Sequence, residues 1–288
     1  MDRKMRTEQV VLSQLQNWAE NEDNIRALIL VGSRVDPRRE PDLLSDYDIE
    51  VYVRETEPIT RDGSSWISEF GSVMVRWPLW PQPTFSDEWI TQLVLFDDGI
   101  RIDFQFTTKK PAECQGFDDE YRVLVDKDGR TEHLPTPTYS THTVRRPTVE
   151  AFDCRMAAFW WDIIYVAKGL RRGELNYAKY MLDGTIRFDK LQPLTEWYVG
   201  VIHGFFSVDV GIFGRWFHRY LDEETWQLYL QTFAGASIED NWRALFETID
   251  FVRVIGKHVA ETCGFDYPEE VDTKVSRYIK DIKEKEAM

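Results

Sequence analysis

The sequence of 288 residues predicts an α+β protein in which a strand-rich N-terminal domain precedes an all-helical C-terminal domain. Up to residue 126, short apolar runs and alternating runs typical of β-strands dominate. From residue 148 onward the large apolar residues recur with the period of an α-helix. The stretch between them, 131–147, is rich in Thr and Pro. We therefore predict domains over 1–140 and 141–288.

The predicted N-terminal domain combines strands with two helical segments. Val11 and Leu15 fall on one face of the first helix, and Asp98-Gly99 is a favoured turn between two strands of a hairpin. Segment 77–85 contains three prolines within six residues, and because proline lacks the N–H that an interior strand donates, we expect a loop there. The predicted elements are helices over 6–20 and 64–70 and strands over 26–31, 46–53, 73–77, 90–97, 100–107 and 121–126.

The predicted C-terminal domain consists of helices. Gly173 ends the first of them. A capping pattern, Ser237-x-x-Asp240, opens the longest, and Gly264 stops it. Pro268 opens the last helix at a position where the missing N–H costs nothing. The predicted helices span 148–171, 174–190, 193–208, 223–233, 238–262 and 268–284.

Composition limits the partners and the compartment. The formal net charge is −15, which disfavours binding to a nucleic-acid backbone and favours attraction of metal or organic cations. Cys114, Cys154 and Cys263 are too dispersed for a disulfide framework or a CxxC site, which suits a reducing cytosol. No apolar run has the length of a signal peptide core or a membrane span. We therefore expect a cytoplasmic protein that binds neither nucleic acid nor membrane.

Chemistry is concentrated in residues 28–53. Leu28 to Val31 form an apolar strand that runs into Gly32-Ser33, a turn whose backbone and hydroxyl can hold a phosphate. On the next strand, Asp46 and Asp48 are two residues apart and face the same side. Two carboxylates so close repel each other unless a cation lies between them, and together they can hold one or two Mg²⁺ ions.

Asp103 is the candidate third carboxylate. It lies between Ile102 and Phe104 in the second strand of the predicted hairpin. If that strand lies beside the one with Asp46 and Asp48, its carboxylate can reach the same metal or accept a proton from an attacking hydroxyl. The alternative is that all three aspartates simply face solvent.

These residues resemble a known pattern. An apolar strand, Gly-Ser, 12 intervening residues, Asp-x-Asp and a later apolar-Asp-apolar strand resemble the nucleotidyltransferase superfamily of DNA polymerase beta. More closely, the segment from Leu30 to Val53 resembles the aminoglycoside 6-adenylyltransferase (streptomycin adenylyltransferase) family, with its Gly-Ser-Arg-Val and Asp-Tyr-Asp motifs. The likeness continues in segments 171–183, 196–201 and 241–245.

The resemblance implies a mixed-sheet nucleotidyltransferase domain, a helical domain and an active site in the cleft between them. It implies transfer of AMP from ATP to the 6-position of a streptomycin-type aminoglycoside, which inactivates the antibiotic and releases pyrophosphate. ATP and a cationic aminoglycoside are the implied partners, with two Mg²⁺ ions as cofactor and a monomer or homodimer as the assembly.

The resemblance also implies roles for individual residues. Asp46 and Asp48 would hold Mg²⁺, and Asp103 would be a metal ligand or a general base. The nucleotide would be held by the Gly32-Ser33-Arg34 turn.

One segment departs from the family pattern. Where the family usually has Gly-Lys-x-Gly-Lys, this chain has Gly211-Ile212-Phe213-Gly214-Arg215, so both lysines are absent. Arg215 could still pair with a phosphate through two N–H groups. Lys179, in a segment that matches the family, is the other candidate for the phosphates.

A polycationic acceptor would suit acidic and aromatic residues through ion pairs and cation–π contacts. The candidates for such contacts are Glu88, Trp161, Asp162, Glu196 and Trp197.

Two alternatives stay open beside the aminoglycoside enzyme. A nucleotidyltransferase acting on another metabolite or on a protein side chain is favoured by the altered Gly211–Arg215 segment. A non-catalytic nucleotide-binding module is disfavoured, because such a module has no need of three carboxylates.

Overall fold

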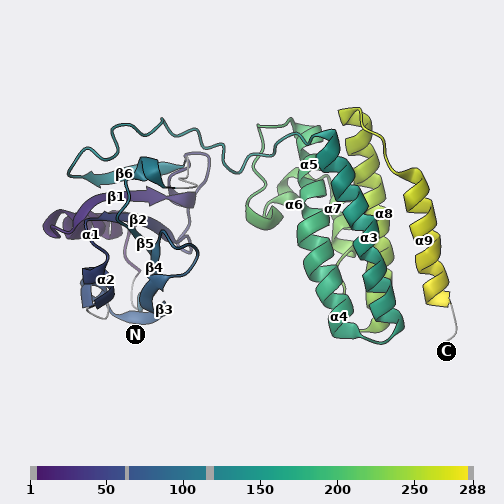
Figure 1. Ribbon diagram of the computed structural model, residues 1–288, viewed down its shortest axis with the longest axis horizontal. Coiled ribbons are helices and arrows are strands. Elements are labelled where there is room, and N and C mark those ends of the chain that lie inside the picture. The colour runs from purple at the N-terminus through teal and green to yellow at the C-terminus, as the bar shows by residue number, and fades with distance from the viewer. Residues whose placement is uncertain (1–4, 62–64, 115–119, 285–288) are drawn as a thin grey trace. The chain divides into compact units, whose positions relative to one another are not determined.

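The computed structural model describes residues 5–61, 65–114 and 120–284, and the chain divides into two compact units, Met1–Thr141 and His142–Met288 (Figure 1). The first unit is built on a sheet and the second on helices. The predicted α+β class is confirmed.

The described part of the first unit forms a six-stranded sheet with the strand order β3-β4-β5-β2-β1-β6. β2 and β5 run parallel, while the other neighbouring strands run antiparallel, so the sheet is mixed. The predicted hairpin is confirmed, with Ile90 paired with Phe106. The strands are β1 (Ile25–Val31), β2 (Tyr47–Val53), β3 (Val73–Pro83), β4 (Ile90–Phe96), β5 (Arg101–Thr107) and β6 (Tyr121–Asp126).

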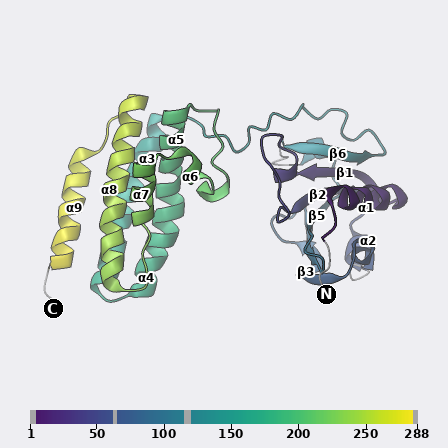
Figure 2. The same cartoon turned by 180° about the vertical axis from the view of Figure 1, so that it is seen from behind.

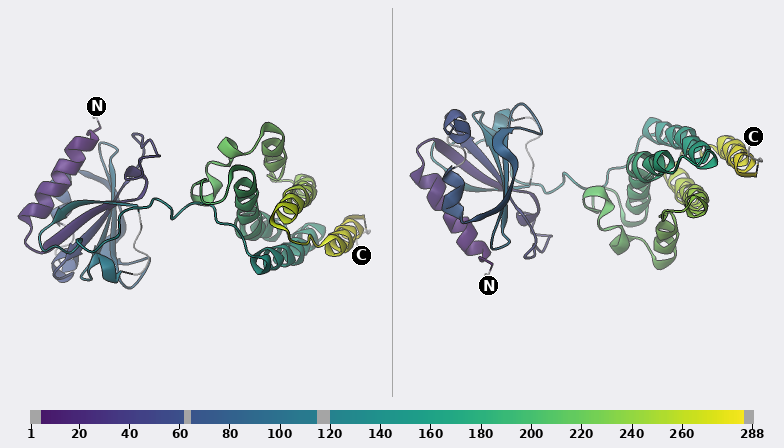
Figure 3. Two further views of the ribbon diagram at one scale, coloured as in Figure 1. Left: turned by 90° about the horizontal axis from the view of Figure 1, so that it is seen from above. Right: turned by 90° about the horizontal axis from the view of Figure 1, so that it is seen from below.

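One face of the sheet is apolar and covered. Figure 3 shows α1 (Glu8–Asn21) lying along this face, and η2 (Ser65–Phe70) contributes to the same core. Residue 64 of the predicted helix lies outside the described residues. Tyr47, Ile49 and Val51 of β2 are buried in this core. Because successive strand residues face opposite sides, the residues between them face away from α1.

The proline-rich segment after residue 77 is a strand, so the loop expected there is wrong. β3 continues through Pro83 and pairs with β4 again where Gln82 lies opposite Thr91, after an irregularity in the register between Trp77 and Gln82. β3 is the first strand in the sheet order, so one of its sides has no strand partner among the described residues. An edge strand tolerates proline because its outward N–H groups need no ladder partner.

A second difference concerns the ends of helices. The predicted helix over 193–208 is α5 (Gln192–His203), because Gly204, at φ 94°, leaves the helical conformation. The predicted helix over 174–190 is α4 (Leu175–Lys179) followed by the wider π-helix η4 (Tyr180–Leu191). The short helices α2 (Glu57–Arg61) and α6 (Phe217–Tyr220) were not predicted, because four or five residues are too few to show a helical period.

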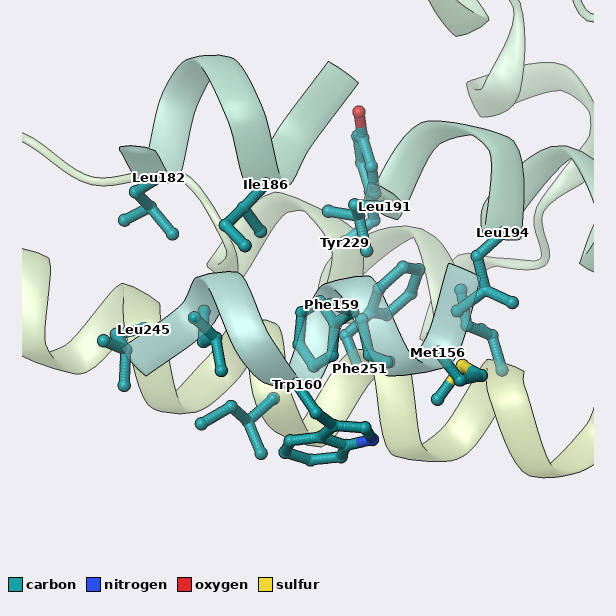
Figure 4. Packing of buried hydrophobic residues seen from close by; sticks show 14 of the residues in the cluster. Met156, Phe159, Trp160, Leu182, Ile186, Leu191, Leu194, Tyr229, Leu245 and Phe251 are labelled. Carbon is teal, nitrogen blue, oxygen red and sulfur yellow. The ribbon is translucent and has the colours of Figure 1, made fainter. Parts of the chain in front are cut away.

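The helical unit packs around α8 (Ile238–Cys263), which contacts α3 (Val149–Arg171), α5 and α7 (Glu223–Gln231) (Figure 2). Its core is aromatic and aliphatic: Figure 4 shows Phe159 and Trp160 of α3 beside Phe251 of α8. The last helix is α9 (Glu269–Glu284). No helix within the described ranges is both long enough and apolar enough to cross a membrane.

Candidate active site

The sheet brings the three aspartates together on the face opposite α1. Asp46 directly precedes β2, Asp48 lies within it, and Asp103 lies on β5. β2 and β5 are neighbours and run parallel, and Asp48 and Asp103 are direct partners in the register. Neighbouring strands are about 4.8 Å apart. The condition set for Asp103, that its strand lie beside the one that carries Asp48, is therefore met.

The Gly32 turn lies against Asp48. Val31, the last residue of β1, is paired with Asp48, and the chain then turns through η1 (Gly32–Arg34). Gly32 has φ +75°, and a Cβ atom built on it would lie 2.6 Å from Oδ2 of Asp48. Only glycine allows this backbone conformation and this approach together. The turn and the carboxylate are thus fitted to each other.

Arg101 was not predicted and lies among the aspartates. Its Nη1 is 3.1 Å from Oδ2 of Asp46. Its Nε and Nη2 donate to the two carboxylate oxygens of Asp103 at 2.8 and 2.7 Å. The signal in the sequence was present, because Arg101 and Asp103 are two residues apart on one strand and face the same side.

The carboxylates remain short of positive charge despite Arg101. Burial, with the like charges of Asp103 and Asp46 beside it, raises the pKa of the Asp48 carboxyl to about 7. Burial also raises the pKa of Asp46, whereas the positive charge of Arg101 acts to lower it. A divalent cation would relieve this repulsion and favours carboxylate oxygens as ligands. The residues present therefore fit a Mg²⁺ site in chemical type, and they share one face of the sheet.

Their present arrangement is not that of a formed metal site. Across the described residues, no three His, Cys, Asp or Glu side chains are grouped so that they could hold a metal ion. At the aspartates, a guanidinium stands where a cation is expected. The assignment of Asp46, Asp48 and Asp103 to a metal stays a prediction.

Arg34 supports the loop that carries Asp46. Its guanidinium lies 3.8 Å from the ring centre of Tyr47 and donates to the main-chain oxygens of Ser45 and Asp46 at 2.7 and 3.0 Å. It also pairs with Glu8 at 3.1 Å, and its side chain is only 5% exposed. In this structure Arg34 holds the loop in place, and its predicted contact with a nucleotide stays a prediction.

The other two candidates for phosphate contact lie in the helical unit. Lys179 pairs with Asp183 at 2.8 Å and donates to the carbonyl oxygens of Ala234 and Gly235. Arg215 is exposed and follows the short helix η5 (Ile212–Gly214). Both assignments stay predictions.

The acidic candidates for the acceptor already have partners. Glu88, in the sheet unit, pairs with Lys109. Asp162, in the helical unit, pairs with Lys190 at 3.5 Å. Glu196 accepts a hydrogen bond from Gln192, and burial raises its pKa. A cationic acceptor would have to compete with these contacts.

The two tryptophan candidates differ in exposure. Trp161 on α3 is 66% exposed. Trp197 on α5 is partly buried against the core, with the guanidinium of Arg155 5.6 Å from its ring centre. Of the two, Trp161 has the surface that a cation or sugar could stack on.

Comparison with known proteins adds a family. Residues 5–282 match the family model described as streptomycin adenylyltransferase. The chain is 29% identical to an aminoglycoside 6-adenylyltransferase of Bacillus subtilis (strain 168) over 96% of this chain and 98% of that protein. It is 29% identical to one of Campylobacter jejuni over 98% and 97% of the two chains. A crystal structure of an aminoglycoside 6-adenyltransferase from Bacillus subtilis covers 98% of this chain and 100% of that one, with 25% identity and a TM-score of 0.48.

Proposed function

The chain belongs to the streptomycin adenylyltransferase family, and on that basis we propose that it transfers AMP from ATP to a hydroxyl of an aminoglycoside. The proposed acceptor is streptomycin or a relative, modified at the 6-position, and the consequence is inactivation of the antibiotic. The proposed compartment is the cytoplasm, where ATP is available and where free thiols such as those of the three cysteines stay reduced.

The observation that carries this proposal is the register of β2 and β5. It makes Asp48 and Asp103 neighbours, with Asp46 at the same edge and the Gly32 turn beside them. Phosphoryl chemistry needs positioning and charge stabilisation more than covalent help from the protein. Three carboxylates beside a glycine turn are suited to both tasks, because the turn can position a phosphate and the carboxylates can hold the cations that stabilise its charge.

In the proposed reaction, the acceptor hydroxyl oxygen bonds to the α-phosphorus and the bond from that phosphorus to pyrophosphate breaks. Mg²⁺, held by Asp46, Asp48 and Asp103, would neutralise the charge of the triphosphate. The backbone at Gly32 and the hydroxyl of Ser33 would hold phosphate oxygens. The hydroxyl proton would pass to a carboxylate of this set, for which Asp103 is our candidate.

The acceptor is a polycation, and the chain is strongly acidic, with a formal net charge of −15. Attraction of the acceptor to such a protein is expected at low ionic strength. In the helical unit, Trp161 is the proposed stacking surface, and Asp162 would exchange its lysine partner for a cationic group of the acceptor.

A second candidate keeps the chemistry and changes the acceptor. It is favoured by the segment Gly211–Arg215, in which the lysines usual in the family are absent. Another hydroxyl-bearing metabolite or a protein side chain would then receive AMP.

Pyrophosphate release separates these proposals. The protein is incubated with ATP, Mg²⁺ and each member of a panel of aminoglycosides. Release that depends on streptomycin supports the first proposal. The absence of release with every aminoglycoside, in a protein that binds ATP, contradicts it and favours the second.

A pair of variants tests the site within the same assay. Asp46→Asn removes one carboxylate from the set and should abolish release while the protein stays folded. Asp23→Asn, an exposed aspartate of the same unit that pairs with Arg54 at 3.6 Å, should leave the rate unchanged. Release by Asp46→Asn at the rate of the unaltered protein would refute the assignment.

A further inference from the structure

Four charged residues, Asp46, Asp48, Arg101 and Asp103, occupy neighbouring register positions on one face of the sheet, and we call this set the square. Tyr47 is paired with Ile102 and Asp48 with Asp103 in the parallel register, so Asp46 and Arg101 lie side by side one position earlier. Three corners of the square are carboxylates and the fourth is a guanidinium. Its formal charge is therefore −2 when all three carboxylates are ionised.

Arg101 donates to carboxylate oxygens that a metal ion would need as ligands. Both oxygens of Asp103 accept hydrogen bonds from Arg101, at 2.8 and 2.7 Å. Oδ2 of Asp46 lies 3.1 Å from Nη1. A Mg²⁺ ion binds carboxylate oxygens at about 2.0–2.1 Å and requires nearly octahedral geometry. A guanidinium in these positions occupies the ligands and repels a second cation.

The same contacts stabilise the aspartates when no metal is bound. A paired arginine and carboxylate with two parallel hydrogen bonds is the stronger kind of ion pair. Without Arg101, two carboxylates of the square would lose the cation that pairs with them, and repulsion within the set would increase. The Arg101 side chain is 42% exposed, so it has room to turn away from the sheet.

We propose that Arg101 is a built-in counter-ion of the aspartate site that a divalent cation must displace, so that Arg101 sets the affinity of the site for metal. Arg101 is thus a positioning residue, which acts through Asp46 and Asp103. The proposal rests on the proposed function in one respect, namely that these aspartates bind Mg²⁺.

The test measures binding of Mg²⁺ alone to the full chain after treatment with a chelator, by titration calorimetry at fixed pH and ionic strength. Arg101→Gln removes the competing charge and should tighten binding on the order of 10-fold. Arg101→Lys keeps the charge but loses the planar fork, so its affinity should fall between the two. Arg54→Gln is the matched control, because Arg54 is similarly exposed, at 53%, and belongs to a surface pair with Asp23.

Thermal unfolding gives a second readout that does not depend on catalysis. Without metal, Arg101→Gln should unfold at a lower temperature than the unaltered protein, because its carboxylates are left unpaired. With Mg²⁺ the deficit should shrink, so the rise in Tm caused by the metal should be larger in Arg101→Gln than in the unaltered protein or Arg54→Gln.

Each outcome of the Mg²⁺ titrations either supports or overturns the proposed role of Arg101. Tighter binding in Arg101→Gln, unchanged in Arg54→Gln, supports the role of Arg101. Equal or weaker binding in Arg101→Gln, while the unaltered protein binds Mg²⁺, overturns that role and leaves the proposed enzyme intact. An absence of Mg²⁺ binding in every variant overturns both the role of Arg101 and the metal assignment on which it rests.

Discussion

The two faces of β2 differ in what they contribute to the protein. On one face, Tyr47, Ile49 and Val51 are buried under α1 and hold the sheet to its helix. On the other, Asp48 lies between the Gly32 turn and Asp103. A single strand of seven residues therefore packs against α1 on one side and carries the proposed chemistry, at Asp48, on the other. Substitutions on the two faces should have separable effects.

The largest expected effect follows from removing the central carboxylate. Asp48→Asn should lower the rate of pyrophosphate release by roughly 10³-fold, because one of the metal ligands is lost. Its stability should be equal to or greater than that of the unaltered protein, because like charges no longer meet at the site. Urea unfolding measured together with the assay checks both. A large loss of stability would show that Asp48 serves the fold instead.

A substitution on the apolar face of β2 should lower the stability and leave the rate nearly unchanged. Ile49→Ala empties space in the core and should cost about 2–5 kcal/mol in the free energy of unfolding. Its rate per folded molecule should change little, because Ile49 points away from the aspartates. Urea unfolding gives the stability, and activity is then measured well below the midpoint. A 100-fold loss of rate with unchanged stability would break the separation of the two faces.

A substitution at Gly32 should affect both the stability of the fold and the rate of the reaction. Gly32→Ala should lower stability by about 1–3 kcal/mol, because a side chain at this φ is strained, and should also lower the rate, because its Cβ displaces Asp48. Gly264 has the same φ, +75°, but a Cβ atom placed on it would have no neighbour within 4 Å among the described residues. Gly264→Ala should therefore show only the stability cost. Equal rates for the two variants would contradict the close fit of Gly32 to Asp48.

The smallest expected effect is a dependence on pH. The pKa of Asp48 is raised to about 7 in the folded chain and is near 4 when unfolded, so between these values the folded state binds the extra proton. The metal-free protein should therefore lose stability as pH rises from about 4 to about 7, relative to Asp48→Asn. Urea unfolding of both proteins across this range measures the difference, and parallel profiles would contradict the raised pKa.

Much of the site could be predicted because it depends on local spacing. Alternation along a strand is enough to place Asp46 and Asp48 on one side, and a glycine after an apolar strand marks the turn. The hairpin turn at Asp98-Gly99 located the strand that carries Asp103. Only the adjacency of that strand to β2 had to be assumed, and the register confirms it.

Apart from the pairing of Arg101 with nearby Asp103, the parts that were missed depend on partners distant in sequence. Arg101 meets Asp46 because β5 lies parallel to β2, and a parallel pairing leaves no turn signal in the sequence. Arg34 was assigned to a nucleotide because of its neighbours, whereas its contacts with Ser45 and Glu8 depend on how the loop folds back. The strand through Pro81 was missed because its edge position is set by the whole sheet order.

The central claim is that the polar face of β2 carries adenylyl transfer to an aminoglycoside. Mass spectrometry of streptomycin after incubation with ATP and Mg²⁺ tests this most directly, with the unaltered protein and Asp48→Asn compared in parallel. The account predicts an AMP adduct of streptomycin with the unaltered protein and, over the same short incubation, roughly 10³-fold less with Asp48→Asn. An adduct formed equally by both proteins, or by neither although both bind ATP, would contradict it.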